Sequence, residues 1–154
     1  MNNIVNEPPQ NENITFNNQL INDVINFCNN KEKDKLTNII SPLHPADLAD
    51  LFTFLSKEQR SYILNNLSED RYTDVLAELD DTIIDETVQE LEDTKVVRSI
   101  SEMETDDAIN LIESLEPAAQ KKILDQVNPT EREILQESLN SVSYTHLTLP
   151  TMLP

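Results

Sequence analysis

Few side chains in this sequence have the types and spacing that catalysis requires. The two histidines, His44 and His146, lie far apart, so they do not have the spacing of a zinc site. His44 precedes Pro45 where a helix should begin, and it is better explained as a helix cap than as a base. The single cysteine, Cys28, is interpreted as core filler. Because the sequence has no glycine-rich phosphate loop and no hydrolase serine motif, we expect no enzyme activity.

Carboxylates are the abundant reactive groups of the chain. The sequence has 29 acidic and 11 basic residues, and its formal net charge is −18. A nucleic-acid-binding protein needs clusters of Lys and Arg, whereas the charges of residues 31–35 alternate in sign, so we do not expect a nucleic-acid partner. The acidity has two interpretations: it keeps the protein soluble, or it forms a surface that responds to cations. Composition alone leaves both open.

A twelve-residue hydrophobic register indicates which elements position these charges. One apolar row comprises Leu43, Leu55, Leu67, Leu79, Leu91, Met103, Leu115, Val127 and Leu139. A second row, three residues ahead of it, comprises Phe52, Leu64, Leu76, Val88, Ile100, Ile112 and Leu124. Twelve residues make about three helical turns, which is too short for a helix that is stable alone. The register therefore predicts an all-α solenoid of short stacked helices, with two units in each repeat.

The starts of these helices are also predicted. Each unit begins one residue after its position in the first row, at His44, Ser56, Ser68, Asp80, Glu92, Glu104, Glu116 and Asn128. Pro45, Pro117 and Pro129 follow at the first helical position, where a missing N–H costs nothing. Two of the starts have the spacing of a capping box, Ser56 with Gln59 and Asn128 with Glu131.

Upstream of the register we predict two more helices. Residues 13–30 have apolar side chains at helical spacing and form the longest predicted helix, which Asn29 and Asn30 end in the left-handed conformation. Residues 33–40 form a short helix that stops near Ser41, because Pro42 disfavours helical geometry in the residue before it.

The domain boundaries follow from where these patterns begin and end. We predict a disordered lead at residues 1–13, a superhelical domain at residues 14–140, and a tail at residues 141–154 that is disordered or is not the natural continuation. The tail lacks acidic residues and a helical stripe. The absence of glycine favours helices over hairpins. No apolar run is long enough to cross a bilayer, and the N-terminus lacks the features of a signal peptide.

The sequence resembles a known family at three segments. Residues 43–51, which read LHPADLADL, followed by short units such as 74–79 and 106–112, are similar to the cytosolic N-terminal domain of MgtE-type magnesium transporters. The likeness extends over about residues 17–140. It implies an acidic right-handed superhelix on the cytoplasmic side of the cell membrane. In that family the domain is followed by CBS domains and by the transmembrane pore of a homodimer.

The resemblance also implies a cofactor, Mg²⁺, bound between the acidic domain and the CBS domains so that high Mg²⁺ closes the pore. Transferred position by position, it implies four ligands: Asp74, Asp106, Asp107 and Asn110. Asn110 stands where the family often has another Asp, and it offers a carbonyl oxygen without a charge. The helix macrodipole alone favours an Asp in a first turn, by about 0.3–1 kcal/mol. Asp47 and Asp50 are interpreted as capping and solvent-facing charges.

A function of a different class also fits the register. Acidic helical arrays can dock basic partners, and the flagellar motor switch family has a related superhelical architecture. The alternative prediction is therefore a protein-interaction scaffold. The two functions differ in their response to Mg²⁺, because only the sensor should change its packing when the ion is added.

Overall fold

The chain is built from short helices. The computed structural model describes residues 18–151, with side chains described for residues 18–140, and it contains no strand within that range. Ten helices follow one another in these residues: α1 (Asn18–Asn29), α2 (Lys33–Ile40), α3 (Pro45–Phe52), α4 (Lys57–Asn65), α5 (Glu69–Glu78), α6 (Asp81–Gln89), α7 (Asp93–Glu102), α8 (Thr105–Glu113), α9 (Pro117–Gln126) and α10 (Pro129–Thr151). The all-α class predicted from the register is confirmed.

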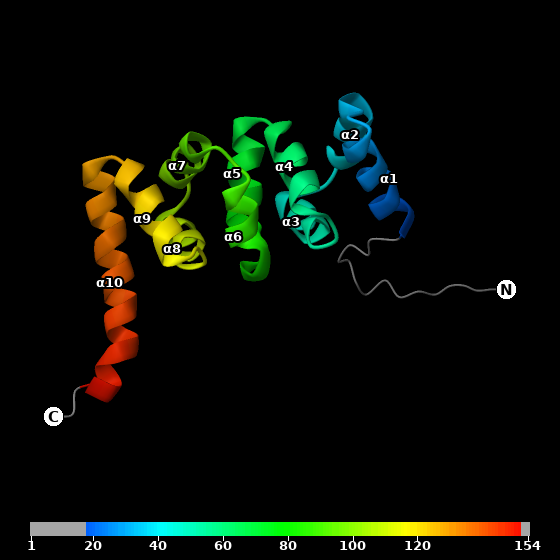
Figure 1. The fold of residues 1–154 in the computed structure, drawn as a ribbon. Coiled ribbons are helices and arrows are strands. Elements are labelled where there is room, and N and C mark those ends of the chain that lie inside the picture. The colour runs from blue at the N-terminus through cyan, green and yellow to red at the C-terminus, as the bar shows by residue number, and fades with distance from the viewer. Residues whose placement is uncertain (1–17, 152–154) are drawn as a thin grey trace.

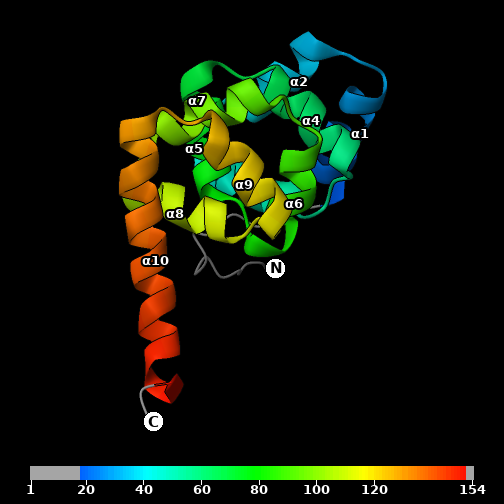
Figure 2. The same cartoon turned by 60° about the vertical axis from the view of Figure 1, so that its left-hand side comes forward.

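The helices stack in alternation along the chain. The helix α3 packs on α5, α5 on α7 and α7 on α9, while α4 packs on α6 and α8 on α10. From α3 to α10 each helix therefore contacts a helix two units away, and a pair of consecutive helices forms one layer. Figures 1 and 2 show the layers following a curved path from α1 to α10. This is the solenoid of paired short helices that the sequence predicted.

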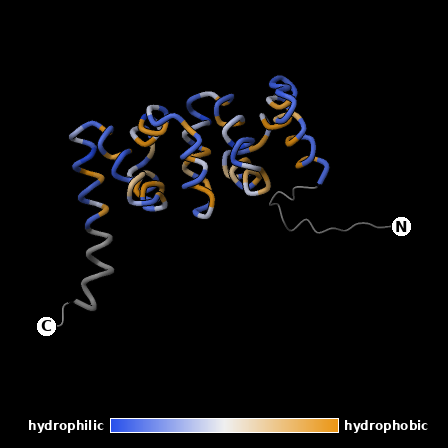
Figure 3. Tube along the Cα trace, in the orientation of Figure 1, coloured by the Kyte–Doolittle hydropathy of each residue, from blue (hydrophilic) through white to orange (hydrophobic). Residues whose placement is uncertain are grey.

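The two predicted rows line the interior. All seven members of the second row are buried, from Phe52 at 0% exposure to Leu124 at 6%. In the first row five members are buried and the other four pack against the core while partly exposed. Two further twelve-residue rows, which begin at Leu48 and at Leu51, are also mostly buried. Figure 3 shows hydrophobic segments gathered on the inward sides of the helices.

The predicted helix starts are confirmed, although the caps differ in kind. Ser56 and Gln59 form a complete capping box. The Asn128 side chain accepts from the backbone N–H of Glu131 at 3.0 Å, while the Glu131 carboxylate accepts from Ser101 in a neighbouring layer. His44 holds a cap position as predicted, but its side chain makes no capping hydrogen bond. Imidazole is not a usual capping group, so the following Pro45 marks this start.

The structure corrects two predictions about α1, one about its end and one about its length. The left-handed residue is Lys31, with φ of 56°, and not one of the asparagines before it. The N–H of Glu32 donates to the carbonyl of Phe27 at 2.9 Å, and the N–H of Lys31 donates to the carbonyl of Cys28 at 3.2 Å. This pair of bonds is a Schellman motif with Lys31 just past the cap. The longest helix within residues 18–151 is α10, whereas the sequence indicated the first one.

This left-handed residue gives a testable prediction. We expect Lys31→Gly to raise the free energy of unfolding by about 0.5–1 kcal/mol, because a left-handed non-glycine residue costs about 1–2 kcal/mol. The gain is reduced by loss of the Lys31 ammonium, which lies 4.8 Å from the ring centroid of Tyr62. Urea unfolding measures the change. Lys35→Gly, inside α2, is the control and should lose about 1 kcal/mol. Equal losses in both variants would contradict the prediction.

The helix α10 continues beyond Asn140 into the segment that was predicted to be disordered or not the natural continuation. The backbone of α10 remains helical to Thr151 and extends away from the stack (Figure 1). Residues 141–149 contain neither Gly nor Pro, so a helix that begins at Pro129 meets no breaker until Pro150. The predicted lead at residues 1–13 lies outside the described residues. Between residues 18 and 151, no helix combines the length and the apolarity that a bilayer crossing requires.

Candidate cation-binding surface

The two aspartates of α8 lie in its first turn. Asp106 is exposed and Asp107 is half-buried. The unit starts at Glu104, whose side chain makes no capping hydrogen bond, so the N-terminal N–H groups of α8 keep their positive partial charge. Among the described residues neither Asp106 nor Asp107 forms an ion pair. The fold therefore places two adjacent carboxylates, one exposed and one half-buried, at the start of α8, and no basic side chain of the described residues pairs with them.

Asn110 lies one turn further along α8, on the wall of a groove. The groove has a volume of about 550 Å³ and runs between the end of α5, the start of α6 and the end of α8. Two carboxylates, those of Asp81 and Glu113, line it with Asn110. The Ser114 hydroxyl joins its walls, since it lies 3.0 Å from the Asn110 carbonyl and 3.3 Å from Asp81 Oδ1. The groove is thus acidic and rich in oxygen atoms.

Asp74 does not complete this groove. It is exposed on α5, and it is not among the residues that line the groove beside Asn110. Across the described side chains, no group of three or more His, Cys, Asp or Glu residues is placed to hold a metal ion. The structure therefore brings the predicted ligands to the surface of neighbouring layers without gathering them into one closed site.

Two groove residues, Asp81 and Glu113, were missed by the sequence reasoning. They lie on units that are far apart in the chain and meet only because the layers stack. The twelve-residue register could have supplied the signal, because the hydrogen bonds between neighbouring layers join residues about 26–33 positions apart, as in Thr73 with Ser99 and Ser114 with Asp81.

The other acidic residues of α6 and its cap are already engaged. Asp80 accepts from the hydroxyl and the N–H of Thr82, and these hydrogen bonds lower the pKa of the Asp80 carboxyl. Asp85 accepts from the backbone N–H of Glu116 at 3.2 Å and from the side-chain amide of Gln89 at 2.8 Å. These carboxylates hold the helix cap and join two layers, so they are less available to a cation than those of α8.

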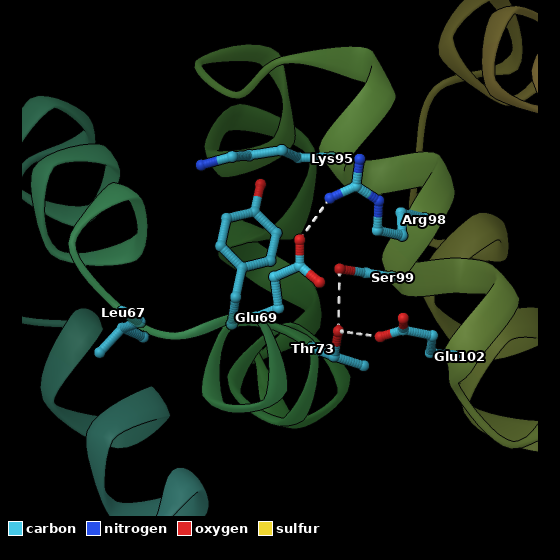
Figure 4. Close-up of a pocket in the computed structure, with 8 residues that line it drawn as sticks. Leu67, Glu69, Thr73, Lys95, Arg98, Ser99 and Glu102 are labelled. Atoms are coloured by element: carbon cyan, nitrogen blue, oxygen red, sulfur yellow. Dashed lines mark hydrogen bonds and ion pairs between the residues drawn. The ribbon is translucent and has the colours of Figure 1, made fainter.

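A second, smaller cavity lies between α5 and α7 and has a structural role. Figure 4 shows Arg98 paired with Glu69, and Thr73 placed between Ser99 and Glu102. The cavity has a volume of about 30 Å³, which is room for one or two water molecules. These polar contacts tie two stacked helices together.

The histidine and cysteine candidates do not form a reactive site. Cys28 is 2% exposed, and burial raises the pKa of its thiol to about 11, so the thiol stays protonated at neutral pH. This fits the prediction that Cys28 is core filler. His44 is exposed at the start of α3. His146 lies beyond the residues whose side chains the structure describes.

Comparison with known proteins gives one family and one related fold. The family model described as the MgtE intracellular N domain matches residues 43–140. No curated protein matches the chain. A solved structure described as "Crystal structure of the soluble part of a magnesium transporter" superposes with a TM-score of 0.67 at 18% sequence identity. The alignment covers 79% of this chain and 48% of that one, so the chain spans about half the length of its structural relative. At this identity the likeness establishes the superhelical fold.

Proposed function

The chain belongs to the family of MgtE intracellular N domains, and from this membership we propose that it is the Mg²⁺-sensing regulatory domain of a magnesium transporter. The observation that carries the proposal is the pair of aspartates on α8, the exposed Asp106 and the half-buried Asp107, which have no ion-pair partner among the described residues. Their surface belongs to a chain with a formal net charge of −18. The structural relative, which is the soluble part of a magnesium transporter, supports the same assignment.

Ion chemistry explains why such a surface would work as half of a site. Mg²⁺ prefers six oxygen ligands at about 2.0–2.1 Å, keeps several of its waters, and is usually bound by one or two carboxylates. Asp106 and Asp107 can supply these carboxylates, while Asn110 on the same helix and Asp74 on α5 can provide further oxygens. A second acidic surface would supply the remaining contacts. The partners we propose for that surface are CBS domains of the full-length transporter.

The regulation follows from a difference in Mg²⁺ affinity between the packed and the separated arrangement of the two surfaces. Two acidic surfaces repel each other without the ion, and Mg²⁺ bound between them stabilises the packed arrangement, which closes the pore. Shifting a two-state equilibrium from 1:99 to 99:1 needs an affinity difference of about 10⁴-fold. One bridging ion that binds the packed arrangement about a hundredfold more tightly does not reach this difference. Two such ions do, because their affinity ratios multiply. We therefore propose at least two cation positions along this surface, one at Asp106 and Asp107 and one nearer the groove at Asn110.

A scattering experiment tests this function in a chain extended through its natural downstream sequence to the end of a CBS pair. Millimolar Mg²⁺ at constant ionic strength should reduce the radius of gyration. Exchanging both aspartates, Asp106→Asn with Asp107→Asn, should raise the Mg²⁺ concentration at half-compaction by about tenfold, because one lost ligand pair is worth about 1.4 kcal/mol or more.

The matched control removes the same charge elsewhere. Asp47→Asn with Asp50→Asn lies on α3, an early layer, and should leave the compaction midpoint within about twofold of the parent. If the scattering curve did not respond to Mg²⁺, the interaction-scaffold function would be favoured instead. Equal midpoint shifts in both double variants would assign the response to overall charge and remove Asp106 and Asp107 from the site.

A further inference from the structure

The last described layer of the solenoid, α9 with α10, carries a groove that no described helix covers. It has a volume of about 450 Å³ and lies on other residues than those proposed for the cation. Its lining residues are Pro117, Gln120, Lys121, Leu124, Asp125, Arg132 and Gln136. In the first helix pair of the register, α3 with α4, the corresponding surface is covered by the next layer, since α5 packs on α3 and α6 on α4.

The repeat shows what an arginine at this place binds. Arg132 lies six units after Arg60, at the same position of the twelve-residue register. Arg60 is 5% exposed. Its Nε donates to the Phe52 carbonyl at 2.9 Å, and its guanidinium donates to Glu86 Oε2 at 2.7 Å. Because Glu86 belongs to α6, the carboxylate that pairs with Arg60 comes from the helix of the next layer.

Arg132 lacks the corresponding acceptors. Its Nε is buried and has no hydrogen-bond partner, and its guanidinium forms no ion pair among the described side chains. The neighbouring cation of the groove, Lys121, is paired with Asp125 at 3.1 Å. A buried donor without an acceptor costs about 1–3 kcal/mol, and an incoming carboxylate would recover this cost.

Three other positions of the groove are polar where the layer of Arg60 is apolar. Gln120, Lys121 and Gln136 stand at the register positions that Leu48, Ala49 and Leu64 occupy in the layer of Arg60. Those three apolar side chains are buried, with exposures of 0%, 1% and 0%. The polar replacements are typical of a capping repeat, and they disfavour an apolar helix as the occupant. They favour a hydrophilic segment that binds through a charged side chain.

We propose that this groove docks an acidic helix of a partner protein segment, with an Asp or Glu carboxylate bound to Arg132 as Glu86 is bound to Arg60. Charge complementarity supports this occupant. Of the charged side chains that line the groove, two are basic, Lys121 and Arg132, and one is acidic, Asp125, which is paired with Lys121. The charge left without a partner in the groove is therefore that of Arg132, and it attracts a carboxylate.

A titration of the full chain with one defined probe tests the proposal. The probe is a synthetic peptide of residues 68–91, the α5–α6 pair that carries Glu86 and covers Arg60 in the fold. Nitrogen-15 spectra report the Arg132 Nε–H and the side-chain amides of Gln120 and Gln136 directly. We expect saturable shifts of these signals, and we expect a peptide with Glu86→Gln to bind about tenfold more weakly.

Two protein variants separate a specific site from general attraction. Arg132→Gln should reduce the affinity for the parent peptide by about tenfold. Arg98→Gln removes the same charge from α7, where Arg98 is exposed and paired with Glu69, and it should change the affinity by less than about twofold. Three results would each overturn the proposal: no shift at Arg132, equal affinities of the two peptides, or equal losses in the two variants.

Discussion

Replacing Phe52 by alanine should lower the free energy of unfolding by about 3–5 kcal/mol, whereas Phe54→Ala should lower it by about 0.5 kcal/mol or less. The two aromatic residues are two positions apart and have the same side chain. Phe52 is 0% exposed, at the end of α3, in the row that faces the next layer. Phe54 is 53% exposed in the turn that follows. Truncation of Phe52 leaves a cavity between stacked helices.

Urea unfolding followed by circular dichroism measures this difference. Because each layer is held chiefly by its neighbours, loss of Phe52 should also reduce hydrogen-exchange protection in α5, which packs on α3. Protection lost in α3 alone would mean that the layers unfold independently. Similar losses of stability in the two variants would contradict the register, since that register is the basis for placing Phe52 inside and Phe54 outside.

The interior of this fold could be predicted from sequence because one physical constraint repeats. Each unit has one narrow apolar stripe and can bury it only against the neighbouring layers, so the same positions become apolar in every unit. Leu64, Leu76 and Ile112 share one row, and each is 0% exposed. The helix starts were also predictable, since a cap residue, often followed by proline, occupies a fixed place in each unit.

A polar layer at the end of the described solenoid is visible in the sequence in the same way. Comparison of positions six units apart shows Leu48 replaced by Gln120 and Leu64 replaced by Gln136. These exchanges mark α9 and α10 as a polar terminal layer. The predicted boundary at residue 140 was based on the composition of the tail, and the family match ends at the same residue. A change at one register position adds information that composition does not give, because it indicates whether another layer covers that position.

The candidate cation surface could be predicted only in part. Asp106 and Asp107 were placed in the first turn of a helix, and the structure has them there. The groove that Asn110 shares with Asp81 was not predicted, because it depends on the packing of α5 and α6 against the end of α8. A hydrophobic period gives the faces of helices, but it does not give the distances between polar side chains on different layers.

Replacement of Arg60 is expected to have the second large effect on the free energy of unfolding. Arg60→Ala should lower the free energy of unfolding by about 2–4 kcal/mol, because it removes a buried side chain and leaves the Phe52 carbonyl without its donor. Arg60→Met should cost less, about 1–2 kcal/mol. Methionine fills the same space, and Glu86, whose side chain is 53% exposed, is hydrated when its partner is removed, so the unpaired Phe52 carbonyl accounts for most of the loss. The row that contains Arg60 is apolar at Leu48, Ile84 and Val96, which are all buried.

Arg132→Ala is the matched control for Arg60→Ala, since both residues hold the same register position. We expect a loss of about 0.5 kcal/mol or less at Arg132, because no described helix covers it and it forms no ion pair among the described side chains. Chemical denaturation of the three variants gives the comparison. A large loss at Arg132 would mean that its guanidinium already stabilises this domain. A small loss, beside a large one at Arg60, would mean that the energy of this arginine position depends on a carboxylate brought by the next layer.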